Sequence, residues 1–366
     1  MKFSVLKETI LDELQLLQGI VEKRNTMPIL ANILVTVGDG RVEFVGTDLE
    51  VGLKTAIEAE TEEPGAITIS GKKIFEIVKS LPDGQVVTFR ENDDLMMEIS
   101  SGKSEFKVLC LPKEDYPQVP DAEFDKKISL PLRRLQEMID RVYFAIAQEQ
   151  RYYLNGALLI MKTAGAELVS TDGHRLAYTG SGIEGLAPEN EVRVIVAKKS
   201  LGELRKMAGE SVDFDQDENN LFFRVGRRVL ISRIIESKFP NFEAVIPKDN
   251  PHVLQVANAD FGQAIRRVSL LSTERSRGIK FNVEKNRLKL FSSNPEIGEA
   301  RDDLEVEYKG ASLEVGFNAV YLLDFLSAVG SESVRLEFKD ENSAAVCRPN
   351  PDQDIRYIYV LMPMKI

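Results

Sequence analysis

Hydrophobic residues recur at steps of three and four in three long stretches of the chain, at residues 3–20, 128–146 and 254–272. Because an α-helix has about 3.6 residues per turn, this spacing places them on one helical face. In the second stretch the face is formed by Leu132, Leu135, Met138, Ile139 and Val142. The pattern therefore predicts an amphipathic helix in each of the three stretches.

A pair of strands ending in a polar turn is predicted after each of these helices. The pairs cover residues 30–50, 154–174 and 278–296. Leu30 matches Leu154 at an offset of 124 residues, and the polar pair Thr47-Asp48 matches Thr171-Asp172 at the same offset. The corresponding pair of the third copy is Ser293-Asn294. A register that holds across two features indicates an internal repeat, in which the polar pair closes a turn with its side chains.

Each copy continues with a strand that runs into a second helix, at residues 66–81, 192–209 and 313–330, and then with closing strands. Ser70, Lys198 and Asn318 lie where the period changes from two to about 3.6. Each unit thus has two helices and about eight strands, which makes it a domain rather than a solenoid repeat of about 20 to 50 residues. The predicted fold is α+β, with three similar domains at residues 1–122, 123–250 and 251–366. The connectors at 111–127 and 239–254 are rich in proline and predicted to be extended.

The composition is that of a globular protein, with 43% hydrophobic and 29% charged residues in 366. The first twenty residues carry too many charges for the apolar centre of a secretory signal, so a cytoplasmic location is expected. Cys110 and Cys347 lie far apart without a CxxC spacing. They are expected to be inert thiols in a reducing compartment, with no metal site and no cofactor.

The formal net charge of −11, taken alone, speaks against a nucleic-acid partner. The charges are distributed unevenly, however, because the six predicted helical segments hold 13 basic and 9 acidic residues. Five pairs of adjacent cations lie on four of these helical segments or at their starts: Lys72-Lys73, Arg133-Arg134, Lys198-Lys199, Arg205-Lys206 and Arg266-Arg267. A surface built from the helices would attract phosphates without reading base sequence. The alternative is that helices simply favour Lys and Arg.

One of only two histidines lies in the stretch STDGHRLAYTG, at residues 170–180. Since the Thr-Asp pair recurs in the first copy, the residues peculiar to the second copy are Gly173, His174, Arg175 and Leu176. A catalytic role would need a partner, but His252 is expected in a connector, and no HExxH, GxSxG or complete P-loop pattern occurs. A binding surface is the favoured interpretation, and a simple turn histidine is the alternative. An enzyme that uses Asp172, His174 and Arg175 is the least favoured.

These features together resemble the β subunit of bacterial DNA polymerase III, the family of replicative sliding clamps. The resemblance covers the whole chain. It is carried by TMPIL at 26–30, GTDLE at 46–50, RYYLNG at 151–156, TDGHRLA at 171–177, KFPNF at 238–242, VGFNAVYLLD at 315–324 and VLMPMKI at 360–366.

The resemblance implies a head-to-tail homodimeric ring with helices inside and sheets outside, through which duplex DNA passes. It implies a non-catalytic processivity subunit without metal or cofactor. Its partners would be the replicative polymerase, the clamp loader, and repair and translesion polymerases, all of which dock through short hydrophobic peptides. A clamp-like scaffold that binds peptides but does not encircle DNA is the alternative.

Three sets of site residues follow from the resemblance. The partner-peptide pocket would be lined by Leu154, Thr171, Gly173, His174, Arg175, Leu176, Pro240, Val245, Asn318, Tyr321, Val360, Met362, Pro363 and Met364. The DNA-binding residues would be Arg24, Lys72, Lys73, Gln148, Tyr152, Tyr153, Lys198 and Lys199. The dimer interface would contain Phe106, Val108, Leu270 and Leu271. The alternatives are that the two leucines belong to the core of their own helix, and that both tyrosines are buried.

Three departures from the family pattern accompany this assignment. Ala244 stands where many relatives carry an arginine, which removes a polar contact to the peptide. Lys365-Ile366 replaces a common Arg-Leu ending. Asp12 and Glu13 make the first helix unexpectedly acidic for a surface that faces DNA, so Arg24 and Lys72-Lys73 are expected to take its place.

Overall fold

A computed structural model describes residues 1–21, 27–92, 94–148, 154–273 and 276–366 of the chain. The chain divides into two compact units. The first unit contains Met1–Arg133 and Lys199–Ile234, and the second contains Arg134–Lys198 and Ile235–Ile366. The division between the units falls within the second predicted repeat.

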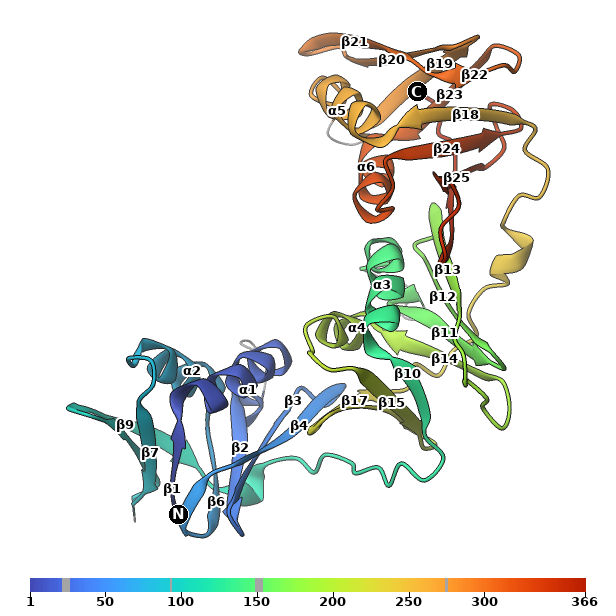
Figure 1. The fold of residues 1–366 in the computed structure, drawn as a ribbon. Coiled ribbons are helices and arrows are strands. Elements are labelled where there is room, and N and C mark those ends of the chain that lie inside the picture. The colour runs from blue at the N-terminus through green and yellow to red at the C-terminus, as the bar shows by residue number, and fades with distance from the viewer. Residues whose placement is uncertain (22–26, 93, 149–153, 274–275) are drawn as a thin grey trace. The chain divides into compact units, whose positions relative to one another are not determined.

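The first repeat has nine described strands and two helices. In chain order they are β1 (Lys2–Leu6), α1 (Lys7–Ile20), β2 (Asn32–Gly38), β3 (Arg41–Thr47), β4 (Val51–Glu58), β5 (Glu60–Glu63), β6 (Gly65–Ser70), α2 (Gly71–Ser80), β7 (Val86–Glu91), β8 (Met96–Ser101) and β9 (Ser104–Leu111). Figure 1 shows α1 and α2 side by side on one face of these strands.

The second repeat has eight described strands and two helices. They are β10 (Ile128–Pro131), α3 (Leu132–Val142), β11 (Gly156–Lys162), β12 (Gly165–Thr171), β13 (Arg175–Gly182), β14 (Val192–Ala197), α4 (Lys198–Leu204), β15 (Ser211–Gln216), β16 (Asn220–Val225) and β17 (Arg228–Arg233).

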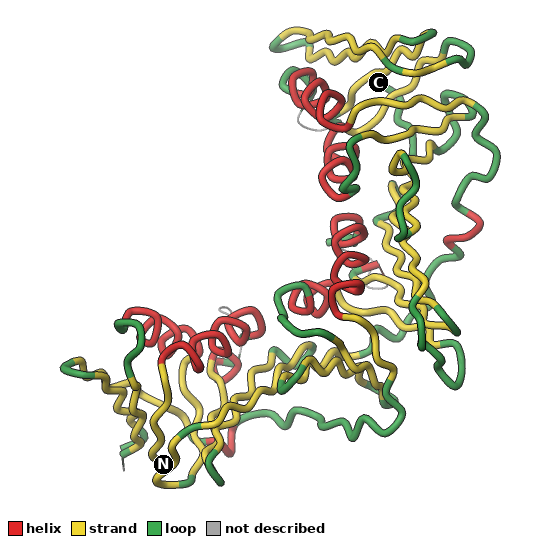
Figure 2. The backbone as a smooth tube through the Cα atoms, viewed as in Figure 1, coloured by secondary structure: helices red, strands yellow, loops and turns green. Residues whose placement is uncertain are grey.

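The third repeat has the same order of elements as the first. They are β18 (His252–Ala257), α5 (Asn258–Ser269), β19 (Gly278–Glu284), β20 (Arg287–Asn294), β21 (Gly298–Glu305), β22 (Glu307–Tyr308), β23 (Leu313–Asn318), α6 (Ala319–Ala328), β24 (Ser333–Phe338), β25 (Ala345–Asn350) and β26 (Arg356–Leu361). In this repeat α5 and α6 lie side by side, and both cover the same side of the strands (Figure 2).

Sheet pairing explains why the second repeat is divided between the units. Its strand β17 pairs antiparallel with β4 of the first repeat, so that β10 and β15–β17 join a thirteen-stranded sheet. Its strand β13 pairs antiparallel with β26 of the third repeat, so that β11–β14 join a nine-stranded sheet. Strands β19, β20, β21 and β23 form a separate four-stranded sheet in the second unit. Backbone hydrogen bonds therefore run across each junction between repeats.

The prediction of helix from the first residue of each long stretch is wrong. Residues 2–6, 128–131 and 252–257 are strands, and the helices begin directly after them. The strand β1 alternates between buried and partly exposed side chains, a period of two that five residues cannot separate from helical spacing. Downstream, α3 buries its predicted face, since each of the five hydrophobic residues named above is at most 1% exposed.

Local sequence accounts for several element ends. The Ser70 hydroxyl accepts a hydrogen bond from the backbone N–H of Lys73 at the start of α2, and the Asn318 side chain accepts one from Val320 at the start of α6. Asp39 and Gly40 both have positive φ, at 48° and 73°, in the two-residue turn between β2 and β3. This is the conformation that a tight antiparallel hairpin requires.

The connectors contain more structure than expected. Short 3-10 helices span Lys113–Asp115 and Phe242–Ala244. Tyr116 is buried against residues of the first repeat, and Phe242 is buried in a cluster shared by the second and third repeats. The placement of His252 in a connector is also wrong. It is the first residue of β18, where it pairs with Phe338.

No helix among the described residues is long and apolar enough to cross a membrane.

Candidate functional site

The Thr-Asp pair closes the same turn in the first and second repeats, as predicted. Thr171 donates its hydroxyl to the carbonyl of Arg175, as Thr47 does to Val51. Asp172 accepts backbone N–H bonds from His174 and Arg175, and Asp48 makes the corresponding pair of bonds in its own turn. The Thr-Asp pair is therefore structural in both copies. The two turns differ in the residues that follow the pair, which are Gly173, His174 and Arg175 in the second repeat.

Arg175 is the most densely bonded side chain of the second-repeat turn. Its Nε donates to Asp172 Oδ2 at 2.9 Å and its Nη1 to Asp324 Oδ2 of α6 at 2.6 Å. The guanidinium also lies 5.2 Å from the centre of the Phe144 ring and 4.2 Å from that of Tyr321. The contacts with Asp324 and Tyr321 connect the turn to α6.

The charge on Arg175 is firmly held. Burial opposes it, but the neighbouring Tyr359 hydroxyl and the carboxylates of Asp324 and Asp172 outweigh this cost and raise the pKa of Arg175 above its ordinary value. With its donors occupied inside the protein, Arg175 is suited to hold the turn in place rather than to bind a ligand directly.

His174 is exposed beside this cluster. Within the described residues its imidazole makes no hydrogen bond or ion pair, while its carbonyl accepts the backbone N–H of Met362 at 3.0 Å. A general base needs an orienting partner, and no described residue provides one to this ring. The arrangement favours a binding surface over catalysis.

Behind the turn lies a buried hydrophobic cluster that contains Leu154, Leu176 and Val360. Leu176 lies on β13 and Val360 on the neighbouring strand β26, whereas Leu154 precedes β11. Phe242 of the second connector also belongs to the cluster. Ile246 packs against it and is partly buried. The neighbouring Val245 is 46% exposed, and Pro240 is also exposed.

The structure thus brings most of the predicted pocket residues to one face of the second unit. We call this face the His174 surface: the turn Thr171–Leu176, Tyr321, and residues 360–364. Asn318 belongs to the same unit, where its side chain caps α6. Four residues that the sequence did not single out support this surface: Phe144, Asp324, Phe242 and Ile246. The only available signal for them was their proximity in sequence to predicted site residues.

Lys72 and Lys73, two of the predicted DNA-binding residues, are exposed on α2, and both pair with Glu76. Lys198 and Lys199 are more enclosed. Lys198 donates to the carbonyl of Ile146 at 3.2 Å, and burial together with the charge of Arg175 lowers its pKa. Lys199 donates to the carbonyl of Ile20 and to the Asp48 carboxylate. These two lysines have structural contacts that leave less of their charge available to a ligand.

Gln148 is exposed. Arg24, Tyr152 and Tyr153 lie outside the described residues, so the assignment of these three residues to DNA binding stays a prediction.

The acidic character of α1 has a structural explanation at Glu13. This carboxylate is fully buried, and it accepts hydrogen bonds from Arg227, Arg228 and Thr55. Burial opposes its ionisation, but the bonds from Arg228, Arg227 and Thr55 prevail and hold the pKa of Glu13 below its usual value. Because its charge is neutralised inside the first unit, Glu13 does not contribute negative charge to the exposed face of α1.

Two of the predicted interface residues lie on strand β9, and the other two directly follow helix α5. Phe106 and Val108 are partly exposed on β9, and the adjacent Leu109 is 69% exposed. Leu270, just after α5, is 76% exposed, whereas Leu271 is partly buried. The alternative that both leucines belong to a helix core is wrong for Leu270.

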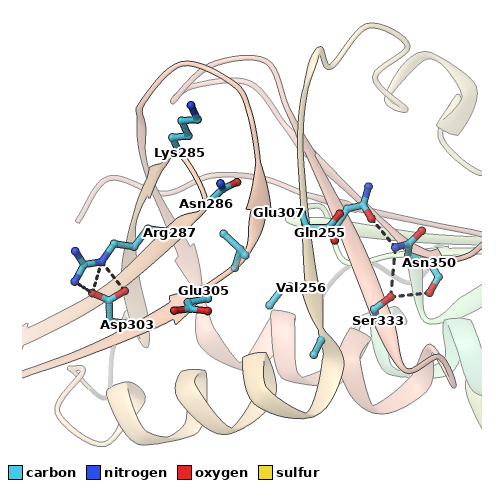
Figure 3. A pocket seen from close by; sticks show the side chains of 12 residues that line it. Gln255, Val256, Lys285, Asn286, Arg287, Asp303, Glu305, Glu307, Ser333 and Asn350 are labelled. Atoms are coloured by element: carbon cyan, nitrogen blue, oxygen red, sulfur yellow. Dashed lines mark hydrogen bonds and ion pairs between the residues drawn. The ribbon is translucent and has the colours of Figure 1, made fainter.

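A polar cavity of about 960 Å³ opens in the third repeat, between the β19–β20 turn, β21 and β18 (Figure 3). Arg287 and Asp303 pair with each other on one side of it, and Asn350 joins Gln255 to Ser333 on the other. No predicted site residue lines it. Its lining contains both basic and acidic side chains, so the lining favours neither an anionic nor a cationic ligand.

In the described part of the chain, no group of three or more His, Cys, Asp or Glu side chains is placed to hold a metal ion. Both cysteines are buried and free. Burial raises the pKa of the Cys110 thiol to about 11, and the pKa of Cys347 is raised further for the same reason. Neither thiol is activated as a nucleophile.

Comparison with known proteins covers the entire chain. Family models of the N-terminal, central and C-terminal domains of the DNA polymerase III beta subunit match residues 1–120, 129–241 and 243–365. The beta sliding clamps of Pseudomonas aeruginosa and Caulobacter vibrioides are 35% and 36% identical to it, with 100% of each protein covered.

Solved structures are similar over the same length. A DNA polymerase sliding clamp from Pseudomonas aeruginosa with ligand has a TM-score of 0.93 at 34% identity. A sliding clamp (DNA polymerase III subunit beta) from Bartonella birtlesii bound to griselimycin has a TM-score of 0.94 at 33% identity. In both comparisons 100% of each chain is covered.

Proposed function

The chain belongs to the family of the DNA polymerase III β subunit, and from this membership we propose that it is a DNA sliding clamp that encircles duplex DNA and tethers polymerases to it. The observation that carries the proposal is the threefold α+β repeat, which matches the family domain by domain along the whole chain. A clamp performs no chemistry on its substrate.

Closure of the ring requires two protomers that meet head to tail. Two strand edges support such a contact. Among the described residues, β9 pairs with β8 on one side but with β6 only at Cys110 and Leu111 on the other. Strand β21 is the last strand of its four-stranded sheet. An exposed strand edge is a template for pairing with another chain.

The charges on these two edges are complementary in one antiparallel register. If Glu105 lies opposite the partner's Arg301, Lys107 falls opposite the partner's Glu299, and Lys103, in the turn just before β9, falls opposite the partner's Asp303. Opposite charges on directly paired strands stabilise a sheet, and like charges destabilise it. The exposed Leu109 and Leu270 supply apolar area near the same edges.

Contact with DNA would be sequence-independent and made to phosphates. Lys72 and Lys73 are exposed enough to take part. The rest of the proposed set is Arg24, Gln148, Tyr152, Tyr153, Lys198 and Lys199, of which the last two are more enclosed. Because a closed ring is held on DNA topologically, each phosphate contact can remain weak and the ring can slide. A net charge of −11 is compatible with this if the cations face the hole.

The partners would dock on the His174 surface through a short hydrophobic peptide. The exposed side chains of His174, Val245 and Met362 surround the buried cluster of Leu154, Leu176 and Val360. Burying two or three peptide anchors at about 1.5 to 3 kcal/mol each, less the cost of ordering, gives affinities near micromolar. With Ala244 in place of an arginine, recognition would depend mainly on apolar contacts.

The decisive experiment is to load the protein onto nicked circular DNA with a clamp loader and then to cut the circle. A sliding clamp stays bound to the intact circle and is released from the linear product. A protein that dimerises and binds the peptide but is not retained on the circle would be a clamp-like scaffold instead.

A further inference from the structure

Residues 362–366 follow β26 and are pinned at two points within the second unit. The backbone N–H of Met362 donates to the carbonyl of His174 at 3.0 Å, and that of Met364 donates to the carbonyl of Gly316 in β23 at 2.9 Å. Pro363 between them has no N–H to donate. The segment therefore connects the His174 turn of the second repeat to a strand of the third.

Two glycines make room for the end of this segment. Gly278 pairs with Asn318 and Lys280 with Gly316, so both glycines lie on one face of the β19–β23 pair. A methyl group at Gly278 would come within 2.9 Å of Ile366 Cδ1, and one at Gly316 within 2.7 Å of the same atom. At Gly316 the methyl would also run into the carbonyl oxygen of Met364. We call this place the glycine slot.

The slot accounts for the burial of both glycines. Their neighbours on the same face, Lys280 and Asn318, are partly exposed, whereas Gly278 and Gly316 are buried. Ile366 itself is 54% exposed, so only part of its side chain is enclosed. The atoms that cover the glycines include Cγ1 and Cδ1 of this residue.

The other repeats do not carry glycine at the equivalent of position 316. The pairing registers place Thr68 there in the first repeat and Ile195 in the second. Only in the third repeat do residues 362–366 cross this strand. The glycine thus occurs where a bulkier side chain would push the segment away.

From this geometry we infer that Ile366, seated in the glycine slot, is a positioning residue for the partner-peptide site. It fixes Met364 against β23, and thereby holds Met362 beside His174 with its side chain 46% exposed. Two backbone bonds alone leave such a short segment prone to fraying, and fraying would remove one wall of the His174 surface. The inference rests on the proposed function, because the surface is the proposed docking site.

The test uses the full-length protein and a fluorescein-labelled peptide of the Gln-Leu-x-Leu-Phe type. Gly316→Ala is expected to weaken peptide binding about tenfold, because it displaces both Ile366 and the backbone at Met364. Gly278→Ala should have a smaller effect, since its methyl meets only the movable end of the Ile366 side chain. Gly182→Ala in β13 is the matched control, because the nearest atom to its methyl is 3.9 Å away. It should bind the peptide as the unchanged protein does.

Substitutions of Ile366 separate positioning from general stability. Ile366→Ala should weaken peptide binding and speed hydrogen exchange at the Met364 amide, while the unfolding midpoint stays the same. Ile366→Leu should keep both the peptide affinity and the slow exchange of the Met364 amide, because leucine still fills the slot. In a chain that lacks residues 362–366, Gly316→Ala should not weaken peptide binding any further, since both changes remove the same wall of the site.

The outcomes distinguish this inference from the proposed docking site. If deletion of residues 362–366 leaves peptide affinity unchanged, the His174 surface is not the docking site and the proposed site is wrong. If the deletion abolishes binding while Gly316→Ala and Ile366→Ala bind normally, the docking site stands and the anchoring role of Ile366 is overturned. The anchoring role would also be overturned if Gly316→Ala weakened peptide binding by the same factor in the chain that lacks residues 362–366 as in the full-length chain.

Discussion

The guanidinium of Arg175 lies 4.2 Å from the centre of the Tyr321 ring, although 146 residues separate the two along the chain. The contact joins the turn of the second repeat to α6 of the third. Together with the ion pairs to Asp172 and Asp324, it holds two elements of the His174 surface in fixed relation.

Replacing Asp324 by Asn should therefore disturb the His174 surface without creating a cavity in the hydrophobic core. Removing one carboxylate from a partly buried, charge-assisted pair is expected to cost about 1 to 3 kcal/mol of unfolding free energy. Urea denaturation measures this cost. Peptide affinity should fall together with it, because the turn loses its tie to α6. The exposed Asp352→Asn is a suitable control, as its partner Arg335 also bonds Glu337. Equal stability of the two variants would show that the Arg175 cluster is not structural.

A second prediction concerns pH and Glu13. Its pKa in the folded state lies below the ordinary glutamate value of 4.5, so as the pH falls the unfolded chain binds the proton first. The stabilisation from Glu13 is thus complete above about pH 4.5 and is lost as the pH falls through the folded pKa. Glu13→Gln should destabilise the protein by about 2 to 4 kcal/mol at pH 7, because two arginines lose their carboxylate.

The difference between the unchanged protein and Glu13→Gln should shrink as the pH is lowered below 4.5. Unfolding free energies measured at several pH values test this. Glu58→Gln, at an exposed position, is the control and should show little effect at any of them. A destabilisation by Glu13→Gln that does not vary with pH would contradict the role assigned to the ionised carboxylate.

Ring closure gives a third prediction. Changing Leu270 and Leu271 to Ala should give folded monomers in analytical ultracentrifugation, because the exposed Leu270 would lose its apolar contact with the partner subunit. Arg301→Glu should also weaken the dimer by placing like charges opposite each other, and Glu105→Arg should restore it in the double variant. A dimer unaffected by Arg301→Glu would exclude the proposed register.

The fourth prediction is that the proposed DNA contacts act without affecting assembly. Replacing Arg24, Tyr152 and Tyr153 by Ala should weaken binding to duplex DNA and slow loading while the dimer persists. Lys72→Ala and Lys73→Ala should reduce the dependence of binding on salt, since each phosphate contact contributes about 0.9 to its logarithmic slope. Binding titrations over a range of salt concentrations measure this. An unchanged slope would mean that these residues do not meet DNA.

The fifth prediction concerns the wall of the peptide site formed by residues 362–366. Deleting them should reduce affinity for the labelled peptide by about 10- to 100-fold, equivalent to the loss of one apolar anchor. Dimerisation and retention on circular DNA should persist, because these residues lie on neither proposed edge strand. Polymerase stimulation should be lost together with peptide binding. Stimulation without peptide binding would place the polymerase contact elsewhere.

The sequence by itself determined the repeating unit of this protein. The helices after each period change, the hairpins and the Thr-Asp turns all depend on residues within a few positions of one another. Local spacing and turn chemistry therefore identified them, and the hydrophobic face of α3 is buried as expected. The strands β1, β10 and β18 were missed because four to six residues do not distinguish a period of two from one of 3.6.

Only the tertiary structure decided which side chains meet across the repeats. Sheet pairing divides the second repeat between two units, buries Glu13 against Arg227 and Arg228, and stacks Arg175 on Tyr321. It also seats Ile366 on Gly278 and Gly316. These contacts join residues that are tens to hundreds of positions apart. No periodicity or spacing encodes them, because they depend on the register of strand pairs and on the space that packing leaves between them.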